Sequence, residues 1–200
     1  MPRPRSPEEA FAGALRQIDA ANSEDPNTVV VDGREYPKEL LYARRMSEWL
    51  SRLAPDAPEH LRLAARSQHL CRWLVPRDSF PLDRRGYLRW RSRLYAFHAE
   101  KAGQILEEVG YDGATVTRVQ GLLQKKNLTS DPEMQILEDV ACLVFLESYF
   151  SEFAERHEPD KLRTIIRKTW KKMSPRGRKA ALRLELPETD RALIVEAVGT

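Results

Sequence analysis

Residues 130–150 read SDPEMQILEDVACLVFLESYF, and their pattern indicates the fold class. Its first four residues fit a capping box with proline at the first helical position, so we predict a helix that begins here and ends near residue 156. The helix is apolar almost all the way round, which is typical of a helix at the centre of a helical protein. Glu138 and Asp139 interrupt this apolar surface. Because a buried ionised group is costly without a partner, the sequence predicts a polar site beside this helix.

Helical patterns also dominate the rest of the chain. We predict helices before the central one at 7–22, 37–53, 56–74, 84–109 and 113–125, and after it at 160–172, 175–184 and 188–198. Asp56 and Glu59 form a second predicted capping box, and only SEDPNTVVVDGREYP (23–37) is expected to form loop or short β-structure. The expected fold is therefore an all-α, single-domain helical bundle. Residues 1–157 would form its core, and residues 158–200 a basic C-terminal helical extension packed on the same domain.

Composition narrows the class of protein. The chain has 200 residues, of which 42% are hydrophobic, and no apolar run approaches the length of a membrane span. The N-terminal MPRPRSPEEAF lacks the apolar stretch of a signal peptide, so we expect a cytoplasmic protein without a membrane partner. Cys71 and Cys142 lack CxxC spacing, and we expect both to be reduced core residues.

Positive charge is unevenly distributed, although the net charge is only +3. Two basic segments, 77–93 and 161–179, contain Trp90 and Trp170 respectively. Such segments can attract the phosphate groups of RNA, or they can be ordinary solvated helix faces. The sequence leaves both interpretations open.

Two histidines add to the polar site. In AARSQHLCRW (64–73), helical spacing places His69 in the same sector as three arginines, and His98 lies on the apolar stripe of the helix at 84–109. Together with Glu138 and Asp139, they bring ionisable groups from three helices toward apolar surroundings. Metal sites and acid–base sites in helical bundles are assembled in this way. The arginines near His69 favour an anion such as phosphate equally well, and they are Arg62, Arg66 and Arg72.

Three long segments carry a family resemblance. They are YARRMSEWLSRLAPDAPEHLRLAARSQHLCRWLVPR (42–77), GYLRWRSRLYAFHAEKAGQILEEVGY (86–111) and QILEDVACLVFLE (135–147). These segments resemble an uncharacterised family catalogued as domain of unknown function 4202. The likeness extends over almost the whole chain and implies no particular activity.

A more distant resemblance is to the HD superfamily of metal-dependent phosphohydrolases. It implies a divalent metal (iron, manganese or zinc) bound by His69, His98 and Asp139. Arg45 matches the arginine of the superfamily's first motif. Tyr42 stands in place of that motif's histidine, and Leu70 in place of the aspartate of its His-Asp pair. The metal motif is therefore incomplete.

These observations lead to three hypotheses. The first is a metal-dependent phosphohydrolase that acts on a nucleotide or phosphorylated small molecule, with Glu138 and Arg72 as catalytic candidates. In this hypothesis the phosphate would be bound by Tyr42, Arg45, Arg66 and Arg72. The alternative is a non-catalytic protein that binds a nucleotide, phosphate or RNA on a degenerate HD scaffold. The third is a structural or partner-binding helical protein whose histidines and carboxylates form one satisfied core network.

Overall fold

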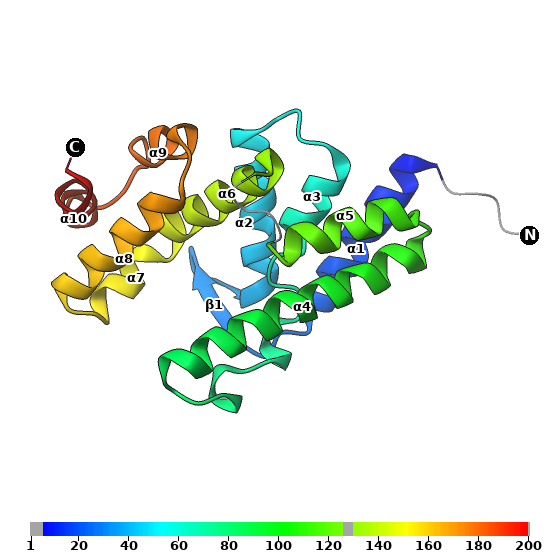
Figure 1. The fold of residues 1–200 in the computed structure, drawn as a ribbon, viewed down its shortest axis with the longest axis horizontal. Helices are drawn as coiled ribbons and strands as arrows, with labels where there is room; N and C mark the ends of the chain where they lie inside the picture. Colours follow the sequence, from blue (N-terminus) through cyan, green and yellow to red (C-terminus); the bar gives the residue numbers. More distant parts are fainter. Residues whose placement is uncertain (1–5, 126–129, 200) are drawn as a thin grey trace, which may run out of the picture.

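The computed structural model describes residues 6–125 and 130–199, and helices make up most of it (Figure 1). This confirms a mostly α-helical single-domain fold. The ten helices of the described residues are α1 (Pro7–Ser23), α2 (Lys38–Leu53), α3 (Glu59–Arg66), α4 (Arg84–Val109), α5 (Gly113–Leu123), α6 (Pro132–Ser148), α7 (Phe150–Glu155), α8 (Pro159–Lys172), α9 (Pro175–Ala181) and α10 (Glu188–Val198). In the expected loop, β1 (Thr28–Val31) and β2 (Arg34–Pro37) form an antiparallel hairpin. Two short 3-10 turns, η1 (Arg72–Leu74) and η2 (Arg77–Ser79), precede α4.

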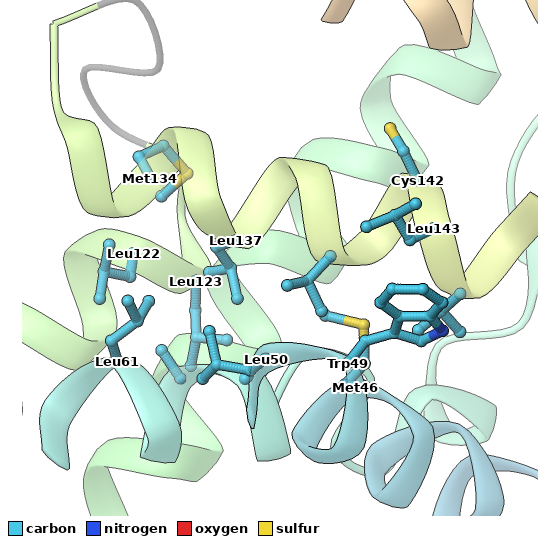
Figure 2. Packing of buried hydrophobic residues seen from close by; sticks show 14 of the residues in the cluster. Met46, Trp49, Leu50, Leu61, Leu122, Leu123, Met134, Leu137, Cys142 and Leu143 are labelled. Carbon is cyan, nitrogen blue, oxygen red and sulfur yellow. The ribbon is translucent and has the colours of Figure 1, made fainter. Parts of the chain in front are cut away.

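The core is centred on α6, as its apolar sequence predicts. Figure 2 shows Met46 and Leu50 of α2 facing Leu137 and Leu143 of α6. All four side chains are fully buried, and each is expected to contribute about 1.5–3 kcal/mol through burial. On its apolar side, α6 packs against α2. The polar residues of α6 therefore lie on its other sides, toward other elements of the fold.

The predicted helix at 56–74 is wrong at both ends. Helix α3 begins at Glu59 without a side-chain cap, and it already ends at Arg66. Residues 67–71 form turns, in which Cys71 adopts a left-handed backbone conformation (φ 53°) and donates its N–H to Asn22 Oδ1 at 2.9 Å. This tertiary hydrogen bond holds the chain in a conformation that a helix could not adopt. His69 therefore lies in a turn, and it does not share a helical sector with the arginines before it.

The central helix differs from its prediction in two details. Its N-cap is Asp131 rather than Ser130, because the Asp131 side chain accepts the N–H groups of Glu133 and Met134, while Pro132 is the first helical residue as predicted. The helix also ends at Ser148, and α7 begins at Phe150 after a change of backbone direction at the residue between them. This break lets the Phe150 side chain turn fully into the core.

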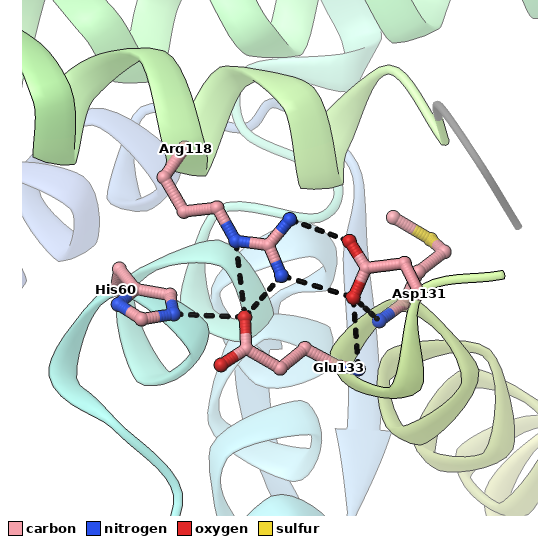
Figure 3. A network of polar contacts seen from close by, with 5 residues as sticks. His60, Arg118, Asp131 and Glu133 are labelled. Carbon is pink, nitrogen blue, oxygen red and sulfur yellow. Dashed lines mark hydrogen bonds and ion pairs between the residues drawn. The ribbon is translucent and has the colours of Figure 1, made fainter.

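A polar network fastens the beginning of α6 to its neighbours (Figure 3). Arg118 of α5 donates to Asp131 and Glu133, and His60 of α3 lies 2.8 Å from the same Glu133 carboxylate. The hydrogen bonds from Arg118 lower the pKa of Asp131 to about 2 and outweigh the opposing effect of burial. Each of these groups has a partner, so the network serves to hold three helices together.

Two further expectations concern the cysteines and the membrane. Cys71 and Cys142 are both free and buried, as predicted. Across residues 6–125 and 130–199, every helix is too short or too polar to cross a membrane.

Candidate functional site

A cleft of about 300 Å³ opens beside α6 and is the candidate functional site. Its walls come from α2, the turn at 67–74, α4, the end of α5, α6 and α8. Among the described residues, four cationic side chains line it, against one carboxylate, that of Glu138; the four are Arg72, Arg91, Lys125 and Lys172. Since both basic segments of the sequence contribute to this set, they meet at the cleft. The arrangement gives the cleft a positive potential.

Glu138 is held between two of these cations. One carboxylate oxygen contacts Lys125 Nζ, the other lies 3.3 Å from Lys172 Nζ, and the side chain is only 5% exposed. Burial alone would raise the pKa of Glu138. The charges and hydrogen bonds of both lysines outweigh that effect and hold the pKa below its ordinary value. Glu138 is therefore ionised, and it competes with any anion for the two lysines.

His69 has partners on both sides of its ring. Its Nδ1–H donates to the buried carboxylate of Glu39 at 2.9 Å, and its Nε2 accepts a hydrogen bond from Arg72 Nη1 at 3.1 Å. The ring of Tyr42 stacks on the imidazole, with 3.8 Å between the centroids. Burial and the charge of Arg72 lower the pKa of His69, and Glu39 only partly offsets them. The imidazole is thus neutral, and its tautomer and orientation are fixed.

His98 has a partner on one side only. Its Nδ1–H donates to the backbone oxygen of Leu70 at 2.9 Å, and the side chain is 2% exposed. Its Nε2 is buried and has no hydrogen-bond partner within the described residues, and the same holds for Nε2 of Gln68, which also lines the cleft. Burial, with a smaller effect of His69, lowers the pKa of His98 to about 3. Its Nε2 therefore carries a lone pair and acts as an acceptor.

The neutral state of His98 makes the protein less stable in acid. We expect about 2 kcal/mol of unfolding free energy to be lost between about pH 7 and about pH 5 through His98. The unfolded chain takes up this proton near pH 6.5, whereas the folded protein resists it down to about pH 3. The stability contributed by neutral His98 is therefore complete above pH 6.5 and is lost as the pH falls from 6.5 to about 3. Urea unfolding of wild type and His98→Asn at about pH 7 and about pH 5 measures this loss. Between these pH values the variant should lose about 2 kcal/mol less unfolding free energy than wild type. An equal loss in both proteins would contradict the assignment of the effect to His98.

Asp139 lies on another side of α6, against α9. Its carboxylate accepts the N–H and Oγ–H of Ser174 at 2.8 and 2.5 Å and the amide of Gln135 at 3.1 Å. Gly177 approaches so closely that a Cβ there would lie 2.6 Å from Asp139 Cγ. Asp139 therefore joins the C-terminal extension to the central helix, and the structure does not bring it to the two histidines.

This placement predicts a purely structural effect for Asp139→Asn. The variant should lose about 1.5 kcal/mol of unfolding free energy, because an amide cannot accept all three hydrogen bonds. Chemical denaturation measures the loss. Ligand binding in the cleft should stay unchanged in the folded variant, and a selective loss of binding would show that Asp139 belongs to the site after all.

The remaining predicted site residues are divided between the cleft and other contacts. Tyr42 and Arg72 line the cleft. Arg66 forms a two-pronged ion pair with Asp19 at 2.6 and 2.7 Å, and Arg45 lies over the ring of Tyr149 at 5.2 Å. Neither of these two arginines is a lining residue of the cleft.

The predicted metal centre has no matching set of ligands. In the part of the chain that the structure describes, no group of three or more His, Cys, Asp or Glu side chains lies close enough together to hold a metal ion. His69 and His98 are neighbours, with 6.0 Å between ring centroids, but Asp139 is engaged by α9. The residues present therefore do not fit the expected iron, manganese or zinc.

Some of the remaining basic side chains bind other groups of the protein. Arg77 donates to the backbone oxygens of Phe80 and Pro81, and Arg163 pairs with Asp160 and Glu196. Binding of RNA through segments 77–93 and 161–179 stays a prediction.

Comparison with known proteins gives one positive result. A search of curated proteins and a search of solved structures found no match, so the HD resemblance stays a prediction. The family model described as Domain of unknown function (DUF4202) matches residues 12–194, which confirms the resemblance carried by the three long sequence segments. With nearly the whole chain matched, the protein belongs to the DUF4202 family.

Proposed function

We propose that the cleft binds a phosphorylated small molecule or nucleotide through its phosphate group. The observation that carries the proposal is the excess of four cationic side chains over one carboxylate around a cleft of about 300 Å³. Each cation about 4 Å from a phosphate charge contributes about 4 kcal/mol of attraction before desolvation, at an effective dielectric constant of about 20. Four of them favour a group with at least two negative charges.

The cations also suit the shape of a phosphate. Arg72 and Arg91 have planar guanidinium groups that can each donate two parallel hydrogen bonds, whereas Lys125 and Lys172 act as compact charges. Cleft volume supports a small ligand, because pockets of this size are at the lower end of the range for small molecules. Trp90 and Tyr87 also line the cleft and provide aromatic surface for a nucleotide base or a sugar.

Calorimetric titration of the full chain with pyrophosphate, inorganic phosphate and AMP at low salt tests the proposal. We expect saturable 1:1 binding that weakens when sodium chloride is added, because dissolved ions screen the charges. Sodium chloride and sodium acetate, titrated alone, are the control anions. Absence of binding to all three phosphate compounds at low salt contradicts the proposal.

A second candidate function is hydrolysis of the bound phosphate ester, and the Glu39–His69 pair favours it. A carboxylate that fixes the tautomer of an imidazole is the arrangement in which histidine acts as a general base. His69 Nε2 is now occupied by Arg72, so it becomes available when Arg72 turns to the phosphate. It can then take a proton from a water molecule whose oxygen forms a bond to phosphorus as the P–O bond to the alcohol breaks. The protonated His69 gives this proton to the departing alkoxide, so that phosphate and alcohol are the products.

The variant His69→Asn separates the two functions, because asparagine retains a donor for Glu39 and loses the Nε2 lone pair. If the protein is a hydrolase, wild type releases phosphate from an ester such as AMP, and the variant binds the ester without releasing phosphate. If wild type binds AMP and releases none, the cleft is a binding site only.

A further inference from the structure

We infer that the ligand carries a free hydroxyl group in addition to its phosphate, and that His98 and Gln68 recognise this hydroxyl. The inference rests on the proposed function and specifies the ligand further. Its basis is that Nε2 of His98 and Nε2 of Gln68 are both buried, both lack a partner within the described residues, and both belong to side chains that line the cationic cleft.

These two nitrogen atoms have opposite requirements. The hydrogen bond from His98 Nδ1 to Leu70 uses the only N–H of the neutral ring, so His98 Nε2 can only accept. Gln68 Nε2 belongs to an amide NH₂ and can only donate. A hydroxyl group donates through its O–H and accepts through its oxygen, so it can pair with either nitrogen. A phosphate dianion only accepts and an ammonium group only donates, so neither can satisfy both.

The second histidine of the cleft has no such unpartnered nitrogen in the structure. Both ring nitrogens of His69 already have partners, Glu39 and Arg72. Only 6.0 Å separates the centroids of the two imidazole rings. A phosphate on Arg72 and a hydroxyl on His98 can therefore belong to one small molecule.

Burial of the two nitrogen atoms makes the site selective for a ligand that carries a hydroxyl. A buried acceptor or donor that lacks a partner carries a free-energy cost, and a ligand hydroxyl removes this cost on binding. A ligand of the same size without the hydroxyl leaves the cost in place, so the site rejects it. The ligand class is therefore a phosphate ester of a polyhydroxy compound, such as a sugar phosphate or a ribonucleotide.

The test compares two phosphate esters of the same chain length, glycerol 3-phosphate with two hydroxyls and propyl phosphate with none. We expect wild type to bind glycerol 3-phosphate at least about tenfold more tightly by calorimetry, as the loss of one buried hydrogen bond predicts. Ribose 5-phosphate and AMP are titrated beside them, and the tighter of the two tells whether a sugar phosphate or a nucleotide fits better.

Variants assign the discrimination to the two residues. His98→Asn keeps a donor for Leu70 and removes the Nε2 acceptor, so the ratio of the two affinities should fall to about one. Gln68→Met removes the donor at nearly the same volume and should lower the ratio as well. The matched control is His60→Asn, which alters a histidine of the network at the beginning of α6 and should leave the ratio unchanged. Because the readout is a ratio, a uniform weakening of binding does not imitate the expected result.

Two results would overturn the inference while leaving the proposed function intact. One is equal affinity of wild type for both esters, and the other is an unchanged ratio in both variants. If His98→Asn fails to fold, the ratio in Gln68→Met decides. A wild type that binds neither ester nor pyrophosphate contradicts the proposed function, and the inference with it.

Discussion

Replacing Arg72 by methionine is expected to weaken pyrophosphate binding about 100-fold, because charge-assisted hydrogen bonds to phosphate are lost. Arg72 contacts His69 Nε2 at 3.1 Å and lies over the ring of Trp90, with its Nε 3.8 Å from a Glu39 oxygen. These contacts hold the guanidinium at the wall of the cleft, so little ordering is needed when the phosphate binds. Methionine keeps most of the apolar stem and removes the charge.

Arg52→Met is the matched control for Arg72→Met. Arg52 is 59% exposed, pairs with Glu147 and does not line the cleft, so pyrophosphate affinity should stay within about twofold. Calorimetry measures both variants. Equal affinities of Arg72→Met and wild type would place the phosphate elsewhere.

Glu138→Gln is expected to act in opposite directions on stability and on binding. The unfolding free energy should fall by about 3 kcal/mol, because the buried carboxylate that now pairs with Lys125 and Lys172 is lost. Pyrophosphate affinity should rise about tenfold, since the carboxylate of Glu138 no longer competes for the two lysines that line the cleft.

Urea denaturation and calorimetry separate these two effects of Glu138→Gln. The matched control is Glu147→Gln, which alters a carboxylate that binds Trp49 and Arg52 outside the cleft and should leave pyrophosphate affinity unchanged. Weaker pyrophosphate binding by Glu138→Gln would mean that Glu138 positions the lysines for the ligand and does not compete with it.

The sequence predicts most helices because their ends are encoded locally. Ser6 and Glu9 form the capping box of α1, and Gly110 ends α4 in a left-handed conformation that glycine adopts without strain. The turn at 67–71 could not be predicted in this way, because it depends on the hydrogen bond between Cys71 and Asn22. Residues so far apart in the sequence leave no periodic signal.

The candidate site was predicted less completely than the fold. The apolar surroundings of Glu138 correctly indicate that it needs partners, but they do not identify these partners, which are Lys125 just after α5 and Lys172 of α8. The sequence does not indicate that Glu39 belongs to the site, because an acidic residue in the first turn of a helix usually only interacts favourably with the helix dipole. Of the three arginines predicted beside His69, Arg72 contacts it. Arg62 and Arg66 instead bind Pro55 and Asp19, because α3 ends at Arg66 and helical spacing does not continue to His69. Tertiary packing decides which helix faces contact one another. The sequence pattern does not contain this information.

Nuclear magnetic resonance of the histidine ring protons during a pyrophosphate titration tests whether the cleft binds phosphate. The chain has four histidines, and two of them, His69 and His98, line the cleft. The other two, His60 and His157, contact Glu133 and Phe153 outside it. We predict saturable shifts of the His69 and His98 signals, with the other two signals unmoved. Unchanged His69 and His98 signals at saturating pyrophosphate would contradict a phosphate-binding cleft.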